Sequence, residues 1–435
     1  MKNVVLDFNL IIKAESDNTC KTGIYYVQYN VIKQLIENYS NRFNFFAFSY
    51  FDKKTFYNVI NKNLPEFKNI KYIDMFSTTE KINNFLKLKI SILRKQKKSS
   101  KNPFAKFGLL CGMILLKFLK LCIPNFKNKK VLKQIDVYQS FFDDIPDKIE
   151  KSSNIKKFIF IYDIIPFTNP EYFVDKEKDK AKIKESFGNK INRIPDDATI
   201  FTDSKYAKSE ILKYFPKFKP ENIVVNLLAT DTKKYYKLDN IDKDKRNEVL
   251  KKYNIPTDRK YILSLCSLNK RKNLAFLVES FVDFLHKNPQ INDLNLVLAG
   301  PNGWLMDEMF NSISNADKYK DRIILAGFID DKDVNMIYNS SLMFICPSLA
   351  EGFGLPVLEA MQCGIPVISS NTTSLPEVYG NSAIGIDPTN MEDLEKAIEE
   401  IYFNEATRSR LIEEGLKQVK GFSWEKTVDN ITNEY

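Results

Sequence analysis

The chain has 435 residues, of which 44% are hydrophobic and 28% are charged, proportions typical of a soluble globular protein with two or three domains. It holds one histidine, His286, which excludes a histidine-rich metal site. The net charge of +10 is local, because residues 81–134 carry 15 Lys and Arg and no Asp or Glu, which leaves −5 for the rest. This distribution argues against a nucleic-acid-binding chain and for one basic face.

The cysteines and the first residues of the chain predict the cellular compartment in which the protein works. The six cysteines are scattered, without a C-x-x-C pair, which suits buried thiols in a reducing environment. The start, MKNVVLDFNLII, has one lysine before a strand-like run and no small-residue cleavage site, so we do not expect a signal peptide. Both features predict a cytoplasmic protein.

The first elements follow the pattern with which a nucleotide-binding half usually opens. A strand is predicted at 3–10, followed by turn-like polar residues at 11–22, a loop that holds Gly23, and a helix at 27–35. The alternative interpretation is the first strand-to-helix turn of any α/β domain. Further strands are predicted at 43–50 and 70–73.

The basic stretch 81–134 has an apolar centre at 107–123 that ends before Pro124. This centre is too short for a membrane span, which needs about 20 apolar residues, and it carries Lys117 and Lys120. The pattern favours a helix lying in the membrane surface, with lysines reaching toward anionic headgroups. The alternative is a core helix with a lysine-rich outer edge.

The middle of the chain continues the alternation of strands and helices. Ser204 is well placed as the N-cap of a helix at 205–215. The polar stretch 232–257 is the best candidate for a linker. The strands predicted before it are 157–161, 196–203 and 223–228.

A strand-to-helix turn in the second half carries Arg271 and Lys272, between a strand at 261–265 and a helix at 274–286. Two cations at such a turn form an anion site, with arginine binding as a fork and lysine as a point charge. The alternative is a solvated basic turn in a lysine-rich chain. The elements predicted next are strands at 294–299 and 322–327 and a short helix at 334–338.

The stretch 341–376 predicts strand, loop, helix and strand. In its loop, Gly352 and Gly354 leave the backbone bare for a ligand, and the loop leads into a helix N-terminus that attracts anions such as phosphate. Glu351 lies in the loop and Glu359 about one turn into the helix, so the two could bracket a ligand. The alternative is an ordinary βαβ unit in which both acids are solvated or favour the helix dipole.

Strands that alternate with helices throughout predict parallel sheets in two doubly wound α/β domains, divided by the polar break. Helices are also predicted at 394–402 and 406–419, and a terminal helix includes Trp424.

The amino-acid sequence around the loop resembles that of the retaining family-4 glycosyltransferases. The run from Glu351 to Glu359 is similar to their E-x7-E motif, and it stands within PS-x-x-EGFGLP, EAM-x-CG-x-PV and SLPE. The resemblance implies the GT-B fold, two Rossmann-like domains that face a central cleft. It implies an acceptor-binding domain at 1–230, a linker at 231–257, a nucleotide-sugar domain at 258–420 and a terminal helix at 421–435 that packs back on the first domain.

The resemblance also implies roles for single residues on the donor side. Arg271 and Lys272 would bind the donor diphosphate, together with the N–H groups from Phe353 to Leu355 beside the bare Gly352 and Gly354. Glu351 would hold sugar hydroxyls, and Glu359 would take the ribose hydroxyls. Two residues in which this chain departs from the family pattern are Cys266, where a glycine is usual, and Val27, where a tyrosine is usual.

Three further positions follow from the resemblance. Gly23 would let the diphosphate approach the backbone. Tyr162 replaces the family's histidine, whereas Asp163 is retained, either to hydrogen-bond an acceptor hydroxyl or merely to cap a strand end.

The implied reaction moves a mannose- or glucose-like sugar from a UDP- or GDP-sugar to a saccharide or lipid-linked saccharide, with retention and without a metal or other cofactor. This suits assembly of a bacterial surface polysaccharide, O-antigen or capsule, at the inner face of the cytoplasmic membrane. The alternatives are a nucleotide-sugar epimerase, a phosphorylase of the same fold, and a non-catalytic nucleotide-sugar-binding protein.

Overall fold

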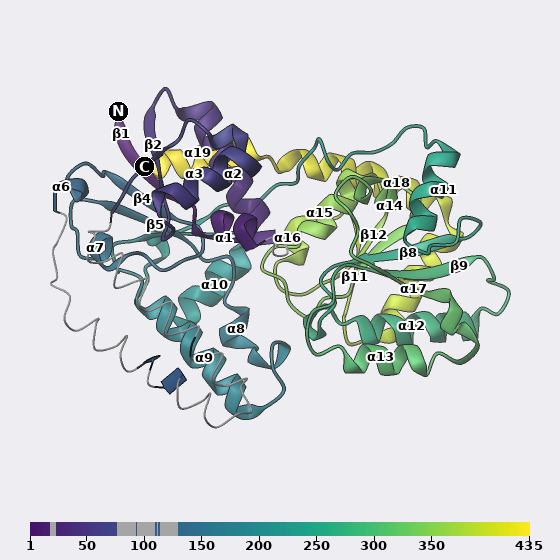
Figure 1. Ribbon diagram of the computed structural model, residues 1–435. Coiled ribbons are helices and arrows are strands. Elements are labelled where there is room, and N and C mark those ends of the chain that lie inside the picture. Colours follow the sequence, from purple (N-terminus) through teal and green to yellow (C-terminus); the bar gives the residue numbers. More distant parts are fainter. Residues whose placement is uncertain (18–22, 76–92, 94–108, 111, 114–128) are drawn as a thin grey trace. The chain divides into compact units, whose positions relative to one another are not determined.

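The computed structural model describes residues 1–17, 23–75, 93, 109–110, 112–113 and 129–435 (Figure 1). The basic stretch 81–134 lies almost entirely outside these residues, so its contact with a membrane stays a prediction. Within the described part of the chain, no helix is long and apolar enough to cross a bilayer.

The chain divides into two compact units, Met1–Lys21 with Leu35–Lys157, and Thr22–Gln34 with Phe158–Tyr435. In the first unit the strands pair in parallel in the order β3-β2-β1-β4. Its strands are β1 (Lys2–Asp7), β2 (Phe43–Phe48), β3 (Lys71–Tyr72) and β4 (Val137–Ser140). Its helices are α1 (Asn9–Asp17), α3 (Lys53–Asn63), α6 (Lys129–Leu132) and α7 (Asp147–Glu150).

The turn expected at 11–22 is wrong, because α1 occupies Asn9–Asp17. Ile11, Ile12 and Ala14 are buried, and α1 packs on α3. Lys13, which stands between them in the sequence, is exposed, so the buried apolar residues decided the structure of this segment.

The second unit contains strands β5 (Lys156–Phe160), whose first two residues belong to the first unit, β6 (Thr199–Thr202) and β7 (Ile223–Val225). They complete the first sheet, whose order is β3-β2-β1-β4-β5-β6-β7. The helices around these strands are α2 (Gly23–Tyr39), which crosses into the first unit, α8 (Ile165–Thr168), α9 (Glu177–Asn192) and α10 (Lys205–Tyr214).

The second sheet lies wholly in the second unit, has the order β10-β9-β8-β11-β12-β13 and is parallel throughout. All residues of β9, β11 and β12 are buried, as expected of strands covered by helices on both faces. The strands are β8 (Lys260–Leu265), β9 (Leu294–Ala299), β10 (Ile323–Gly327), β11 (Met343–Cys346), β12 (Val367–Ser370) and β13 (Ile384–Ile386). The two parallel α/β sheets confirm the predicted fold class.

Helix α12 shows why the second sheet is stable. It buries a stripe at helical spacing, which includes Leu274, Leu277, Val278 and Phe281, in the core of the sheet. The helices of this region are α11 (Lys243–Lys252), α12 (Leu274–Lys287), α13 (Asp307–Ser314), α14 (Val334–Asn339), α15 (Leu355–Gln362), α16 (Leu375–Tyr379), α17 (Met391–Phe403), α18 (Glu405–Gln418) and α19 (Trp424–Glu434).

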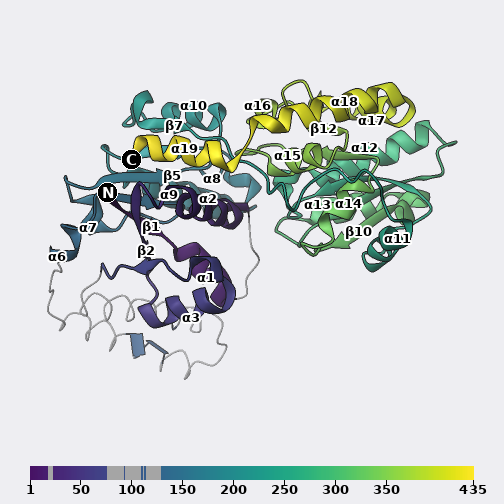
Figure 2. The same ribbon diagram turned by 90° about the horizontal axis from the view of Figure 1, so that it is seen from above.

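Two segments bear on the predicted linker and terminal helix. The stretch 232–257 contains α11, which the Asp242 side chain caps by accepting from the N–H groups of Asp244 and Lys245. Helix α19 lies beside β5 and β7 (Figure 2), where the Thr427 hydroxyl donates to the Leu227 carbonyl at 2.7 Å. The domain bounds given above stay predictions.

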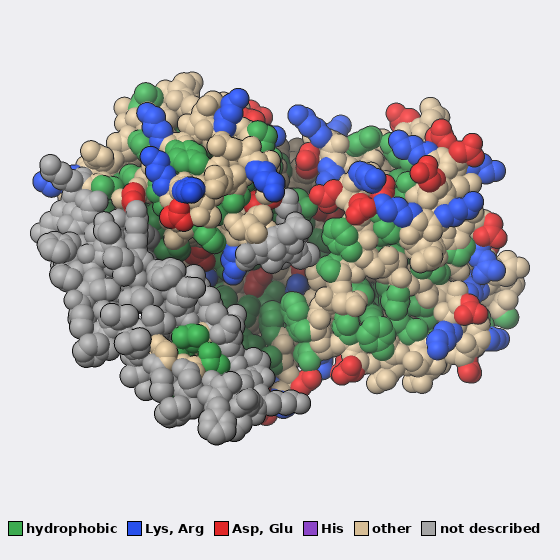
Figure 3. Space-filling view, viewed as in Figure 1, with side chains coloured by type: hydrophobic (Ala, Val, Ile, Leu, Met, Phe, Trp, Pro, Cys, Tyr) green, Lys and Arg blue, Asp and Glu red, His purple; other side chains and the backbone are tan. Residues whose placement is uncertain are grey.

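Charges on the described surface are mixed. Over α11, Lys and Arg side chains stand next to Asp and Glu side chains (Figure 3). This agrees with the near balance of charge that the sequence gives outside 81–134.

Candidate functional site

The candidate site lies where the second sheet reverses its strand order. Strand β9 pairs with one edge of β8 and β10 lies beyond β9, whereas the next strand, β11, pairs with the other edge of β8. In open parallel sheets, ligands bind at the carboxyl ends of the two strands at such a reversal. The loop after β8 carries Arg271 and Lys272, and the loop after β11 carries Glu351, so the topology joins residues 80 positions apart.

The loop after β8 is a tight turn. Residues Lys270–Lys272 form a 3₁₀ turn that ends at Asn273, whose φ of 57° is left-handed, a conformation that asparagine tolerates. The Asn273 side chain donates to the Pro388 carbonyl at 2.8 Å. The Leu349 N–H donates to the Arg271 carbonyl at 2.9 Å, which ties this turn to the loop after β11.

Glu351 forms ion pairs with both cations of the turn. Its Oε2 lies 2.6 Å from Arg271 Nη1, and its Oε1 lies 2.5 Å from Lys272 Nζ. Arg271 Nη1 also donates to the Ala350 carbonyl at 2.5 Å. Glu351 is 7% exposed and Lys272 is 9% exposed, so the three charges form a largely buried cluster with a net charge of +1.

The pKa of Glu351 is lowered to about 2. Burial alone would raise it, but the charges of Arg271 and Lys272 and their hydrogen bonds outweigh burial. The carboxylate is therefore ionised at every pH at which the protein would be assayed, which excludes it as a general acid or base near neutrality.

This shift predicts how stability depends on pH. Because the pKa of Glu351 is lower in the folded than in the unfolded chain, its stabilisation is complete above the ordinary value of 4.5 and is lost as the pH falls toward 2. Urea unfolding of the wild type and Glu351→Gln from pH 6 to 2.5 checks this. The wild type should lose more free energy of unfolding than the variant below pH 4.5, and parallel curves would contradict the assignment.

The two glycines of the loop after β11 meet different requirements. Gly354 has a φ of +112°, and a Cβ there would lie 2.6 Å from Leu375 Cδ2, so a side chain is both strained and obstructed. A Cβ on Gly352 would lie 2.8 Å from Asp163 Oδ2 and 3.3 Å from Asp203 Oδ2. Helix α15 then begins at Leu355, followed by Pro356, which has no N–H, and the Val357 N–H donates to the Gly354 carbonyl at 3.0 Å.

Glu359 lies about one turn into α15, in surroundings unlike those of Glu351. The Tyr338 hydroxyl donates to its Oε2 at 2.9 Å, and its carboxylate is also hydrogen bonded to Tyr235. Burial raises the pKa of Glu359, although these bonds and the charge of Lys234 oppose the rise. The structure therefore separates the two glutamates, one bound to two cations and the other to two phenols.

Gly23 is the first residue of α2, and a Cβ built on it would lie 3.9 Å from Leu355 Cδ1. Gly23 therefore lies beside the start of α15. Val27, four residues on, is buried. Phe353 is buried too, and its ring packs edge-on against Phe422 at 5.9 Å.

Asp163 lies at the end of β5, opposite Gly352. Its Oδ1 accepts from the Ile165 N–H at 2.9 Å, and burial raises the pKa of its carboxyl although Arg271 opposes the rise. Asp203, at the end of the neighbouring strand β6, is 3% exposed, and burial followed by the charge of Asp163 raises its pKa well above 3.8. A small pocket adjoins Asp163, and Tyr162 is not among the residues that line it. The Tyr162 ring is stacked on Phe160.

Sequence reasoning missed Asp203 and Glu377 as parts of this region. The Glu377 carboxylate accepts from the N–H groups of Lys205 and Tyr206 at 2.8 and 2.7 Å, at the start of α10. Ser204 accepts from the Ala207 N–H, as predicted for an N-cap, and its hydroxyl donates to the Gly352 carbonyl at 2.9 Å. The available signal was that an aspartate follows shortly after each of β5 and β6, because the ends of adjacent parallel strands bring such residues together.

The comparisons concern the sequence first. Residues 245–418 match the family described as glycosyl transferases group 1. The chain is 30% identical over 294 residues to the O-antigen chain mannosyltransferase B of Escherichia coli. The alignment covers 67% of this chain and 71% of that protein. It is 29% identical over 274 residues to the serotype-specific mannosyltransferase WbdA of Escherichia coli. That alignment covers 61% of this chain but only 31% of the relative.

Solved structures share the fold over the whole chain. A glycosyltransferase from Rickettsia africae ESF-5 has a TM-score of 0.62 and 16% identity, and the match covers 100% of this chain and 97% of that one. Anabaena HepE, solved in complex with UDP and glucose, has a TM-score of 0.62 and 12% identity, with 100% and 99% covered. At such identities the likeness shows the fold alone.

Proposed function

The chain belongs to the glycosyl transferases group 1 family and has the GT-B fold, and from this membership we propose that it transfers a sugar from a nucleoside-diphosphate sugar to a saccharide hydroxyl with retention of anomeric configuration. One observation carries the proposal. Glu351 is held between Arg271 and Lys272 at the strand-order reversal, beside the start of α15, where a diphosphate and a sugar can bind side by side.

The cation pair is suited to a diphosphate leaving group. An arginine has five N–H donors and a lysine three, and Glu351 engages one nitrogen of each. The remaining donors can bind phosphate oxygens, and the N-terminus of α15 adds a favourable dipole. Since Glu351 offsets only one of the two positive charges, the cluster keeps the net charge of +1 that attracts an anion.

The chemical step follows from what the site holds. The bond from the anomeric carbon to the phosphate oxygen breaks, and a bond to the acceptor oxygen forms on the same face of the sugar. The acceptor proton passes to the leaving phosphate oxygen, so no side-chain base is required. Arg271 and Lys272 stabilise the negative charge that develops on the phosphate. Asp163 orients the acceptor by accepting a hydrogen bond from a hydroxyl next to the one that reacts, which leaves the reacting proton free to pass to the phosphate.

Glu351 and Glu359 hold the two ends of the donor. Glu351 accepts hydrogen bonds from sugar hydroxyls while its own charge keeps Arg271 and Lys272 in position. Glu359 takes the ribose hydroxyls, as an acid does in nucleotide-binding folds generally. The mannosyltransferase relatives support a mannosyl donor and a role in polysaccharide assembly.

A thermal unfolding assay with nucleotide sugars tests the donor side. GDP-mannose and UDP-glucose are added separately to the wild type, each beside its free sugar and free nucleoside monophosphate. One nucleotide sugar should raise the unfolding temperature by several degrees, and the free sugar should not. If neither nucleotide sugar raises it at millimolar concentration, the proposal fails.

Gly23→Ala tests whether the diphosphate approaches the start of α2. The added Cβ meets only ordinary contact at 3.9 Å, so we expect the unfolding temperature to stay unchanged. A diphosphate close to the Gly23 backbone would meet that methyl group, so the KM for the donor should rise about tenfold, equivalent to ~1.4 kcal/mol. An unchanged donor KM would remove Gly23 from the site.

Because two side-chain cations already face the diphosphate, we expect activity without a divalent metal. Adding 5 mM EDTA to the transfer assay, against a control with 5 mM MgCl₂, should change the rate less than twofold. Loss of activity in EDTA that MgCl₂ restores would contradict this.

A further inference from the structure

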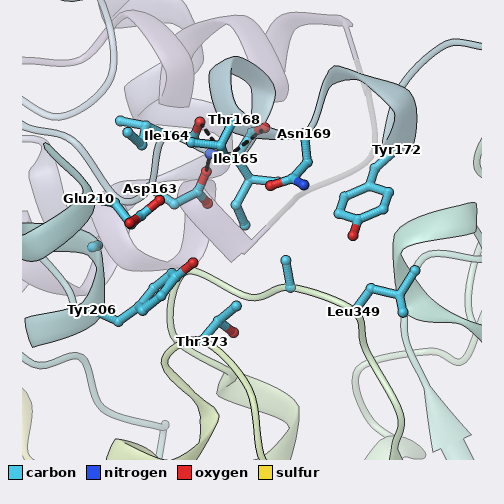
Figure 4. A pocket seen from close by; sticks show the side chains of 12 residues that line it. Asp163, Ile164, Ile165, Thr168, Asn169, Tyr172, Tyr206, Glu210, Leu349 and Thr373 are labelled. Carbon is cyan, nitrogen blue, oxygen red and sulfur yellow. Dashed lines mark hydrogen bonds between the residues drawn. The ribbon is translucent and has the colours of Figure 1, made fainter. Parts of the chain in front are cut away.

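A small pocket adjoins the loop that carries Glu351 and is formed entirely within the unit Thr22–Gln34 and Phe158–Tyr435. Its volume is about 160 Å³. That is less than the ~300 Å³ at which sites for drug-sized ligands begin, so it suits one ring of a larger ligand. The side chains that decide its chemistry are those of Asp163, Asn169, Tyr172, Tyr206, Glu210 and Thr373 (Figure 4).

The pocket combines aromatic rings with hydrogen-bonding groups. The hydroxyls of Tyr172 and Tyr206 point toward the space between the two sides of the pocket (Figure 4), and both side chains are half-buried. An aromatic ring with a polar tip can cover the C–H face of a sugar and bond its hydroxyls. The Asn169 amide donates to Glu171 at 3.1 Å, which leaves its carbonyl oxygen to accept from a ligand.

The side chains that line the pocket disfavour an anionic ligand, although the charge of Arg271 reaches Asp163 and Tyr172 from behind the shared wall. Among the described residues that line it, Asp163 and Glu210 are acidic and none is Lys or Arg. Lys213, which pairs with Glu210 at 3.3 Å, is 63% exposed and does not line the pocket. A phosphate or carboxylate placed here would lose water and meet two carboxyl groups.

The pocket shares a wall with the site for the donor. Ala350 lines it, and the Ala350 carbonyl accepts from Arg271. Thr373 also lines it, and its hydroxyl oxygen accepts from the Glu351 N–H at 3.1 Å. A sugar in this pocket would therefore bring its hydroxyls next to the sugar that Glu351 holds.

We propose that this pocket is the acceptor subsite and that it takes an uncharged sugar residue of a saccharide, in preference to a phosphorylated sugar or a uronic acid. The inference rests on the proposed function. Tyr206 and Tyr172 cover the ring, Asn169 and Glu210 bond its hydroxyls, and Asp163 accepts from the hydroxyl next to the one that reacts.

Matched acceptors test the charge preference. The wild type is assayed with the nucleotide sugar that protects it, using methyl α-mannoside, methyl α-glucoside and methyl α-galactoside, each beside its 6-phosphate. At least one neutral glycoside should be glycosylated with a kcat/KM at least about tenfold above that of its 6-phosphate. Transfer to no neutral glycoside, or equal or better use of a phosphate, overturns the inference.

Variants of three residues on α10 test whether the acceptor binds in this pocket. Tyr206→Ala should raise the acceptor KM about tenfold or more with less than a twofold change in donor KM, and Glu210→Gln should raise the acceptor KM in the same direction. Tyr214→Ala, a 40% exposed tyrosine two turns further along α10, is the matched control and should leave both KM values unchanged. If Tyr206→Ala folds poorly, Tyr206→Phe keeps the ring and should still raise the acceptor KM.

The outcomes separate the two proposals. A wild type that no nucleotide sugar protects and that releases no nucleoside diphosphate contradicts the proposed function itself. A wild type that transfers, together with an unchanged acceptor KM in Tyr206→Ala and Glu210→Gln, overturns only the acceptor subsite.

Discussion

Glu351→Gln should lower kcat/KM for transfer by a factor of about 100 to 1,000, the range found when one stabilising polar contact to a transition state is removed. The carboxylate performs two tasks that an amide cannot. It holds Arg271 and Lys272 by ion pairs of 2.6 and 2.5 Å, and it accepts strong hydrogen bonds from sugar hydroxyls. With glutamine the two cations lose the charge that fixes them.

A matched control separates this effect from destabilisation. Glu395 is also 7% exposed and pairs with Lys287 at 2.6 Å, away from the candidate site. Both Glu351→Gln and Glu395→Gln should lower the unfolding temperature, because each removes the charge of a buried carboxylate that forms an ion pair, although Lys287 keeps its contact with Asp283 at 2.9 Å. Only Glu351→Gln should abolish most transfer, and an equal loss in Glu395→Gln would mean that stability rather than chemistry was measured.

Lys272→Met should lower kcat by a factor of about 100 or more, with a smaller change in donor KM. The lysine faces charge that develops on the leaving diphosphate, so it stabilises the transition state more than the bound donor. Methionine keeps a long unbranched side chain in this 9% exposed position, so packing changes little. Steady-state kinetics with varied donor checks the split between kcat and KM.

The control for Lys272→Met is Lys287→Met, which removes a lysine paired with Glu395 and Asp283. It should keep wild-type kinetics. If Lys272→Met has a raised donor KM but an unchanged kcat, the lysine binds the donor equally in the ground state and the transition state. It would then not stabilise the leaving group specifically.

The positions of the two loops of the candidate site were predictable because their signals are local. The turn with Arg271 and Lys272 and the loop from Glu351 to Leu355 each follow a short buried strand, and both strands lie at the reversal of strand order. The sequence did not reveal that Glu351 pairs with both cations, since that contact joins residues 79 and 80 positions apart.

The pocket was less predictable. Asp163 was proposed from the family pattern, but Tyr206 and Glu210 line the pocket only because α10 packs near the loops after β11 and β12. Asp203 stands next to Asp163 because β5 pairs with β6. The first fact depends on tertiary packing that local patterns do not show, whereas the second could be inferred from the aspartates that follow these two strands.

Among the helices that sequence reasoning missed, α11 is polar and buries only Val249 and Leu250, so its hydrophobic periodicity is weak. In contrast, α1 buries Ile11, Ile12 and Ala14 within a segment that was interpreted as a turn. The helices α3, α9 and α13 were not predicted either.

The central claim is transfer with retention at the site formed by Arg271, Lys272 and Glu351. It is tested most directly by incubating the wild type with the protecting α-linked nucleotide sugar and the preferred neutral methyl glycoside, and assigning the product's anomeric configuration by proton NMR. We predict an α-linked product, with release of nucleoside diphosphate that depends on the acceptor. A β-linked product, or release at the same rate without acceptor, would contradict this account.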